Sequence, residues 1–95
     1  MIFAEFNQTS DYSDFYPELA VFVRANFGNV DSGLQGDAWI HIQEGNDEVQ
    51  LDTFSSMQFQ VKSKGSCELV DTVIKIIGAR YELTVLDNPI WDEDE

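Results

Sequence analysis

Hydrophobic and polar residues alternate along five segments of the chain, which is the pattern of strands with one buried face. These segments cover residues 2–7, 38–43, 49–54, 57–62 and 81–85. The turn signal Glu44-Gly45-Asn46-Asp47 between the second and third segments predicts a β-hairpin. Residues 57–62 are predicted to add a third strand to this hairpin, with an extended edge segment as the alternative.

Two other segments repeat apolar residues every three to four positions, which is typical of amphipathic helices. The first covers residues 14–27, and the second begins after Ser66 and ends at Gly78. The second helix is expected to be well buried, because it has a wide apolar arc made of Leu69, Val70, Val73, Ile74, Ile76 and Ile77. Residues 29–37 are predicted to form a loop, and Asn88-Pro89 is expected to end the last strand.

The order of these elements predicts an α+β fold. We expect a single-layer, antiparallel-rich sheet of four to five strands with two helices on one face, in the order β-α-β-β-(β)-α-β. Without the third meander strand this is the ferredoxin-like split arrangement, a frame that carries many activities and therefore assigns none. One domain is expected over residues 1–90, followed by an acidic C-terminal tail at residues 91–95.

Acidic residues dominate the composition. The 95 residues include 18 Asp and Glu but only 5 Lys and Arg, for a formal net charge of −13. This balance argues against binding to nucleic acid or to anionic membranes, because both need a positive surface. Residues 1–61 hold ten acidic residues and one basic residue, so the charge is concentrated before Lys62. The charge either keeps the chain dissolved or steers it onto a basic partner.

The sequence excludes several kinds of chemistry and suggests a compartment. A single histidine and a single cysteine cannot make a Cys/His zinc site, and a calcium loop starting at Asp31 fails because Ile42 stands where a glutamate is required. Phosphate-binding and dinucleotide-binding motifs are absent from the sequence, so we expect no metal and no cofactor. The lone Cys67 and the lack of a secretory signal favour a cytoplasmic location.

The outer face of the hairpin supplies the candidate binding residues. They are expected to point away from the helices or to lie in the turn, and they are Trp39, His41, Asp52, Phe54, Gln58, Glu44, Asp47 and Glu48. Trp39 and Phe54 are large apolar groups to expose, and aromatic residues are enriched at interfaces. Alternatively, these two rings pack across the strands, or Ile90 and Trp91 cover them.

Three functions fit these observations. The leading hypothesis is a non-enzymatic acidic module, monomeric or weakly dimeric, that binds a basic protein as an immunity protein, an inhibitor or a mimic of nucleic acid would. The second is a small-molecule-binding or regulatory domain that dimerises through its sheet. The third is a small enzyme in which Asp52 orients His41 as a general base. No catalytic residue is assigned under the leading hypothesis.

Overall fold

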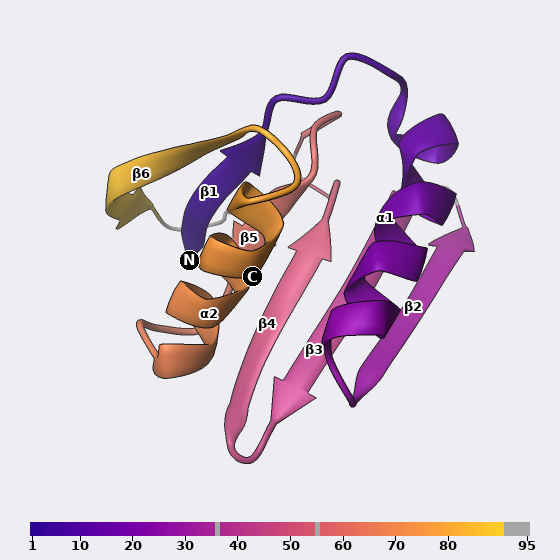
Figure 1. Ribbon diagram of the computed structural model, residues 1–95. Coiled ribbons are helices and arrows are strands. Elements are labelled where there is room, and N and C mark those ends of the chain that lie inside the picture. The colour runs from indigo at the N-terminus through magenta and orange to yellow at the C-terminus, as the bar shows by residue number, and fades with distance from the viewer. Residues whose placement is uncertain (36, 55, 91–95) are drawn as a thin grey trace.

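Within residues 1–35, 37–54 and 56–90, which the computed structural model describes, six strands form one antiparallel sheet and two helices pack against it (Figure 1). The strands are β1 (Ile2–Phe6), β2 (Val30–Gln35), β3 (Asp37–Glu44), β4 (Asp47–Asp52), β5 (Gln60–Lys62) and β6 (Leu83–Ile90). The helices are α1 (Tyr12–Asn26) and α2 (Glu68–Gly78). The α+β class is therefore confirmed, and the sheet is larger than the four to five strands expected.

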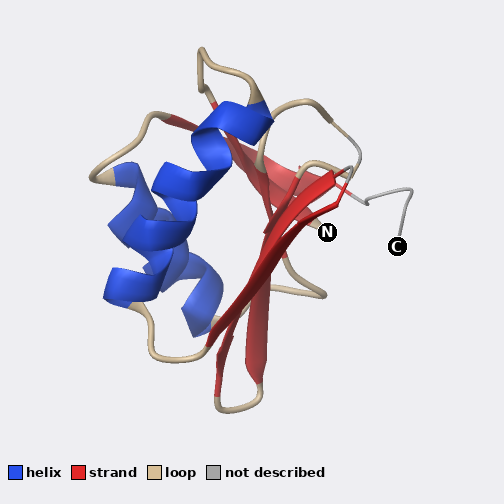
Figure 2. Ribbon diagram, turned by 90° about the vertical axis from the view of Figure 1, so that its right-hand side faces the viewer, coloured by secondary structure: helices blue, strands red, loops and turns tan. Residues whose placement is uncertain are grey.

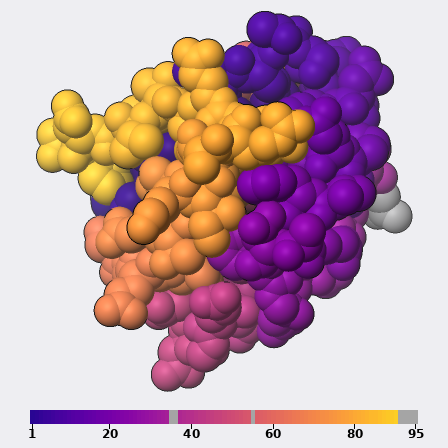
Figure 3. All heavy atoms as spheres, in the orientation of Figure 1, coloured from indigo at the N-terminus to yellow at the C-terminus, as the bar shows by residue number. Residues whose placement is uncertain are grey.

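The strands lie in the order β2-β3-β4-β5-β1-β6, and every neighbouring pair is antiparallel. Figure 2 shows both helices on the same face of this sheet. In Figure 3, which views the molecule from that side, α1 and α2 lie next to each other over the strands. No described helix covers the opposite face, which we call the open face.

The core lies between the sheet and the helices, where alternate strand residues meet the apolar side of α2. Ile40, Leu51 and Val61 are paired across β3, β4 and β5, and all three are completely buried. Helix α2 buries Leu69, Val70, Val73 and Ile77, whereas Ile74 and Ile76 are only partly buried. Each fully buried side chain of this size stabilises the fold by roughly 1.5–3 kcal/mol.

The prediction of a loop at residues 29–37 is wrong for most of this segment. Residues Val30–Gln35 form β2, an edge strand that pairs with β3 from Val30 opposite Ile42 to Gln35 opposite Asp37. Polar residues and Gly33 weaken the strand pattern of this segment, but hydrogen bonding to the strongly patterned β3 outweighs its low strand propensity. This strand accounts for the larger sheet.

The last strand is also longer than expected. It begins at Leu83 and continues through Asn88 and Pro89 to Ile90, which lies opposite Ile2. Proline is tolerated there because β6 is an edge strand, where a residue can do without a hydrogen-bonding N–H. Ile90 is 53% exposed on the edge strand farthest from β2 and β3, so it does not cover Trp39. Trp91 and the acidic tail lie outside the described residues.

The remaining boundaries differ by smaller amounts. Helix α1 runs from Tyr12 to Asn26 rather than over residues 14–27, and the third meander strand is confined to Gln60–Lys62 rather than residues 57–62. Four strands lie between the helices, so the ferredoxin-like order is not confirmed. In the part of the chain that the structure describes, no helix has the length and apolarity needed to span a membrane.

Candidate functional site

Strand register places two rows of side chains across the open face. The first row is Gly33, Trp39, Asp52, Gln60, Glu5 and Thr84. The second row is Asp31, His41, Gln50, Lys62, Ile2 and Ile90. These rows point away from the helices, because residues between them such as Ile40 and Leu51 are buried on the helix side.

Trp39 lies near one end of this surface, against the edge strand. A Cβ atom built on Gly33 would come within 2.6 Å of Trp39 Cζ2, so the indole rests directly on the β2 backbone. The ring of His41, two residues further along β3, lies 4.9 Å from the Trp39 ring, measured between centroids. Both side chains are half-buried. Trp39 thus shows the cross-strand packing given as the alternative, although the residue is not fully buried.

Asp52 is not the exposed residue that the sequence led us to expect. Its carboxylate lies 2.6 Å from the Lys62 ammonium, and both side chains are at most 2% exposed. Asp52 Oδ1 also accepts a hydrogen bond from the Phe54 backbone N–H at 3.3 Å. The register brings β5 beside β4 and so places Lys62 next to Asp52, which the alternation pattern alone does not reveal.

Phe54 lies over this buried pair. Its ring centroid is 6.0 Å from Lys62 Nζ, within reach of a cation–π contact, and the residue is 47% exposed. Phe54 is therefore the expected outward-facing aromatic residue. Gln58 does not join it, since Gln58 Nε2 donates to the Gln8 carbonyl at 3.4 Å, in the loop that follows β1.

The three acidic residues of the hairpin cluster at its turn. Glu44 and Asp47 are the last pair of β3 and β4, and Gly45 between them takes a φ of +59°, which side-chain-bearing residues rarely adopt. Glu48 shares the open face with Gln50, whose Nε2 donates to the Glu48 carboxylate at 2.9 Å. Glu44 and Asp47 continue the alternation of the buried Ile42 and Val49, so they fall on the helix side of the sheet, and only Glu48 extends the open face toward the turn.

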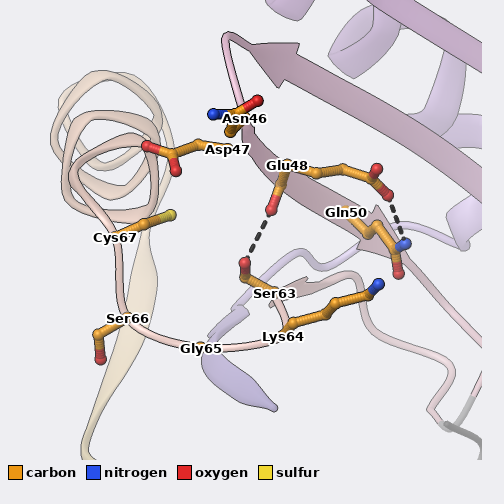
Figure 4. A pocket seen from close by; sticks show the side chains of 9 residues that line it. All are labelled: Asn46, Asp47, Glu48, Gln50, Ser63, Lys64, Gly65, Ser66 and Cys67. Atoms are coloured by element: carbon orange, nitrogen blue, oxygen red, sulfur yellow. Dashed lines mark hydrogen bonds between the residues drawn. The ribbon is translucent and has the colours of Figure 1, made fainter.

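A hollow of about 440 Å³ lies beside this turn, between β4 and the loop that precedes α2 (Figure 4). Its lining residues are Asn46, Asp47, Glu48, Gln50, Ser63, Lys64, Gly65, Ser66 and Cys67. The Ser63 hydroxyl donates to the Glu48 carbonyl at 2.7 Å and ties the two walls together. Polar groups of both signs line this hollow, so it suits a small polar ligand better than an apolar one.

The register bears on the proposed His41–Asp52 dyad. His41 lies opposite Gln50, whereas Asp52 lies opposite Trp39 and is engaged with Lys62. Among the described residues, no group of three or more His, Cys, Asp and Glu side chains is placed to hold a metal ion.

The sequence matches no protein-family model, and no curated protein or solved structure matches it significantly. Function must therefore be inferred from the side chains of the site. Gly33 is the site residue that sequence reasoning missed. A glycine within a strand often marks a close approach by another group, but the signal was hidden because residues 29–37 read as a loop.

Charge on this part of the sheet is one-sided. Residues 30–52, from the start of β2 to the end of β4, contain no Lys or Arg, and their six acids are Asp31, Asp37, Glu44, Asp47, Glu48 and Asp52. The register puts four of these acids on the open face, and they are Asp31, Asp37, Glu48 and Asp52, whereas Glu44 and Asp47 fall on the helix side. With Lys62 paired to Asp52, the open face of β2, β3 and β4 keeps an excess of three negative charges. The half-buried Trp39 and the exposed Phe54 therefore lie on a face whose net charge is negative.

Proposed function

We propose that this protein is a non-enzymatic binding module that docks a basic protein on its open face, over β2, β3 and β4. The observation that carries the proposal is the combination of Trp39 and Phe54 with an excess of three negative charges on the open face of the same strands. Aromatic side chains supply contact area and opposite charge accelerates association, which is how tight, fast complexes form. An immunity protein, an inhibitor of a basic enzyme or a mimic of nucleic acid would use such a surface. The lone Cys67 favours a reducing compartment such as the cytoplasm.

The test separates the effect of the open-face acids on binding from the effect of the net charge of the molecule. One variant carries Asp31→Lys and Asp37→Lys on the open face, and its control carries Asp14→Lys and Asp71→Lys on the helices. All four residues are exposed, and each variant moves the net charge from −13 to −9. Proteins captured in low salt are identified and purified, and their binding to the three forms is then measured by calorimetry.

We expect a basic protein to bind the wild type and the helix variant, and to bind the open-face variant far more weakly. Two results contradict the proposal. One is that no basic protein is captured in low salt, and the other is that both variants weaken the complex equally. Equal weakening would mean that the charge acts as a whole, without a docking face.

The hollow beside the hairpin turn favours a second candidate function, a domain that binds a small polar molecule. Its volume of about 440 Å³ falls in the range of ligand pockets, which span about 300–1,000 Å³. Native mass spectrometry of gently purified protein tests this candidate. A retained molecule that is lost in Ser63→Val, which removes the tie to Glu48, would support it, and a clean apo mass would count against it.

A further inference from the structure

Trp39 is held in place before any partner arrives. Its indole rests on Gly33 of β2 and lies next to the His41 ring of β3, so it is supported on two neighbouring strands. A side chain that is already fixed loses little conformational freedom when it is bound. The indole is therefore a preorganised apolar platform at the edge of the open face.

Carboxylates stand around this platform. Asp37 lies two residues before Trp39 on the same face of β3, which corresponds to about 7 Å along the strand. Asp31 lies two residues before Gly33 on β2, diagonally across from Trp39, and both aspartates are exposed. The nearest acid across the hairpin, Asp52, is already engaged with Lys62, so Asp31 and Asp37 are the two carboxylates that face a partner.

An indole flanked by carboxylates selects among cations. A guanidinium group is flat and weakly hydrated, so it can stack on the ring and still bind a carboxylate through two parallel N–H groups. An ammonium group is compact and strongly hydrated, so it gains less from the ring. Carboxylates bind both groups, with some advantage for the two parallel N–H groups of a guanidinium, and the ring increases the preference for the guanidinium.

We propose that the open face recognises an arginine side chain of its partner, with the guanidinium stacked on Trp39 and paired with Asp31 or Asp37. This inference rests on the proposed function, since it names the group by which the basic partner is read. It also goes further, because a basic partner that docks through lysine would agree with the proposed function but would contradict this inference.

The test uses two peptides of equal length and spacing, one with arginine at every basic position and one with lysine. Titrations are done in low salt on protein carrying Trp91→Phe, so that the indole N–H signal in the proton–nitrogen spectrum belongs to Trp39. We expect the arginine peptide to bind about tenfold more tightly than the lysine peptide and to shift this signal. In Trp39→Leu the preference for the arginine peptide should fall sharply, because only the contacts to Asp31 or Asp37 remain.

A second variant keeps the tryptophan and moves it. In Gly33→Ala the new methyl group would lie 2.6 Å from the indole, so the ring must shift, and the preference for arginine should fall. Gly28→Ala is the matched control, because nothing lies within 4 Å of a Cβ built there. This pair keeps the inference testable if Trp39→Leu does not fold.

Equal affinity for both peptides in the wild type overturns the inference, and so does an arginine preference that is undiminished in Trp39→Leu. If both peptides bind equally and Asp31→Asn with Asp37→Asn weakens both, the proposed function stands without the arginine site. If neither peptide binds, the arginine site is overturned, and the capture experiment decides separately whether the proposed function falls with it.

Discussion

The buried Asp52–Lys62 pair makes a sharp prediction about single residues. Removal of one partner leaves the other charge buried without compensation, which destabilises a protein by about 3–5 kcal/mol. We therefore expect Lys62→Met to lower the free energy of unfolding by that amount, measured by urea denaturation. Asp52→Leu combined with Lys62→Met should recover most of the loss, because neither charge of the pair is then left in the interior.

The ion pair between Arg80 and Glu18 provides the control. Its atoms are 4.0 Å apart and its side chains are 61% and 57% exposed, so Arg80→Met should lower stability by less than about 1 kcal/mol. A similar loss in Lys62→Met and Arg80→Met would show that the Asp52–Lys62 pair is not sealed from water.

Tyr81 gives a second prediction, on pH. Burial, the hydrogen bond to Glu18 and the Glu18 charge raise the pKa of Tyr81 from 10.0 to about 12, although Arg80 acts in the opposite direction. The unfolded chain releases this proton near pH 10, while the folded chain keeps it until about pH 12, so stability should fall as pH rises through this window. Denaturation of the wild type and Tyr81→Phe at several alkaline pH values measures this loss, which should be smaller in the variant. Equal losses in both proteins would contradict a pKa shift.

At the scale of elements, β2 shows how the sheet protects its edge. The Gln43 N–H donates to the Asn29 carbonyl, and in an antiparallel ladder every second residue bonds to the neighbouring strand. The N–H and C=O groups of Val30, Ser32 and Leu34 therefore point outward, away from β3. Arg24 of α1 donates to the Val30 carbonyl at 3.3 Å and to the Ser32 hydroxyl at 2.5 Å. Charged groups at an edge hinder pairing with another sheet.

Arg24→Ala should therefore make the chain associate through β2. We expect a monomer–dimer mixture for this variant at concentrations where the wild type is monomeric, measured by sedimentation equilibrium. Lys75→Ala is the control, because Lys75 also lies in the last turn of a helix and its removal changes the net charge equally. Identical behaviour of the two variants would show that Arg24 does not guard the edge.

The elements also show how far sequence reasoning reaches. Strict alternation around Ile40 and Leu51 correctly predicted the hairpin and its buried face, because both strands contribute to one core. The same alternation correctly turned Asp52 away from the helices. It missed the ion pair with Lys62, because Lys62 comes from a strand whose neighbours the pattern does not specify. Strand β2 was missed for a related reason, since pairing with β3 stabilises a segment whose own pattern is weak.

At the scale of the whole molecule, the charge of −13 destabilises the folded chain by repulsion but favours binding to a basic partner. The molecule measures 29 × 28 × 24 Å, whereas charges are screened beyond about 10 Å in 0.1 M salt. Added salt should therefore relieve repulsion between distant acids and raise the melting temperature, by about 4–8 °C for each 1 kcal/mol relieved. The same salt should slow association with a basic partner and weaken the complex. The melting temperature and the affinity for the partner, both measured by calorimetry over one salt series, test these two effects. A melting temperature that does not change with salt would show that the acids are already spaced or paired well enough to avoid repulsion.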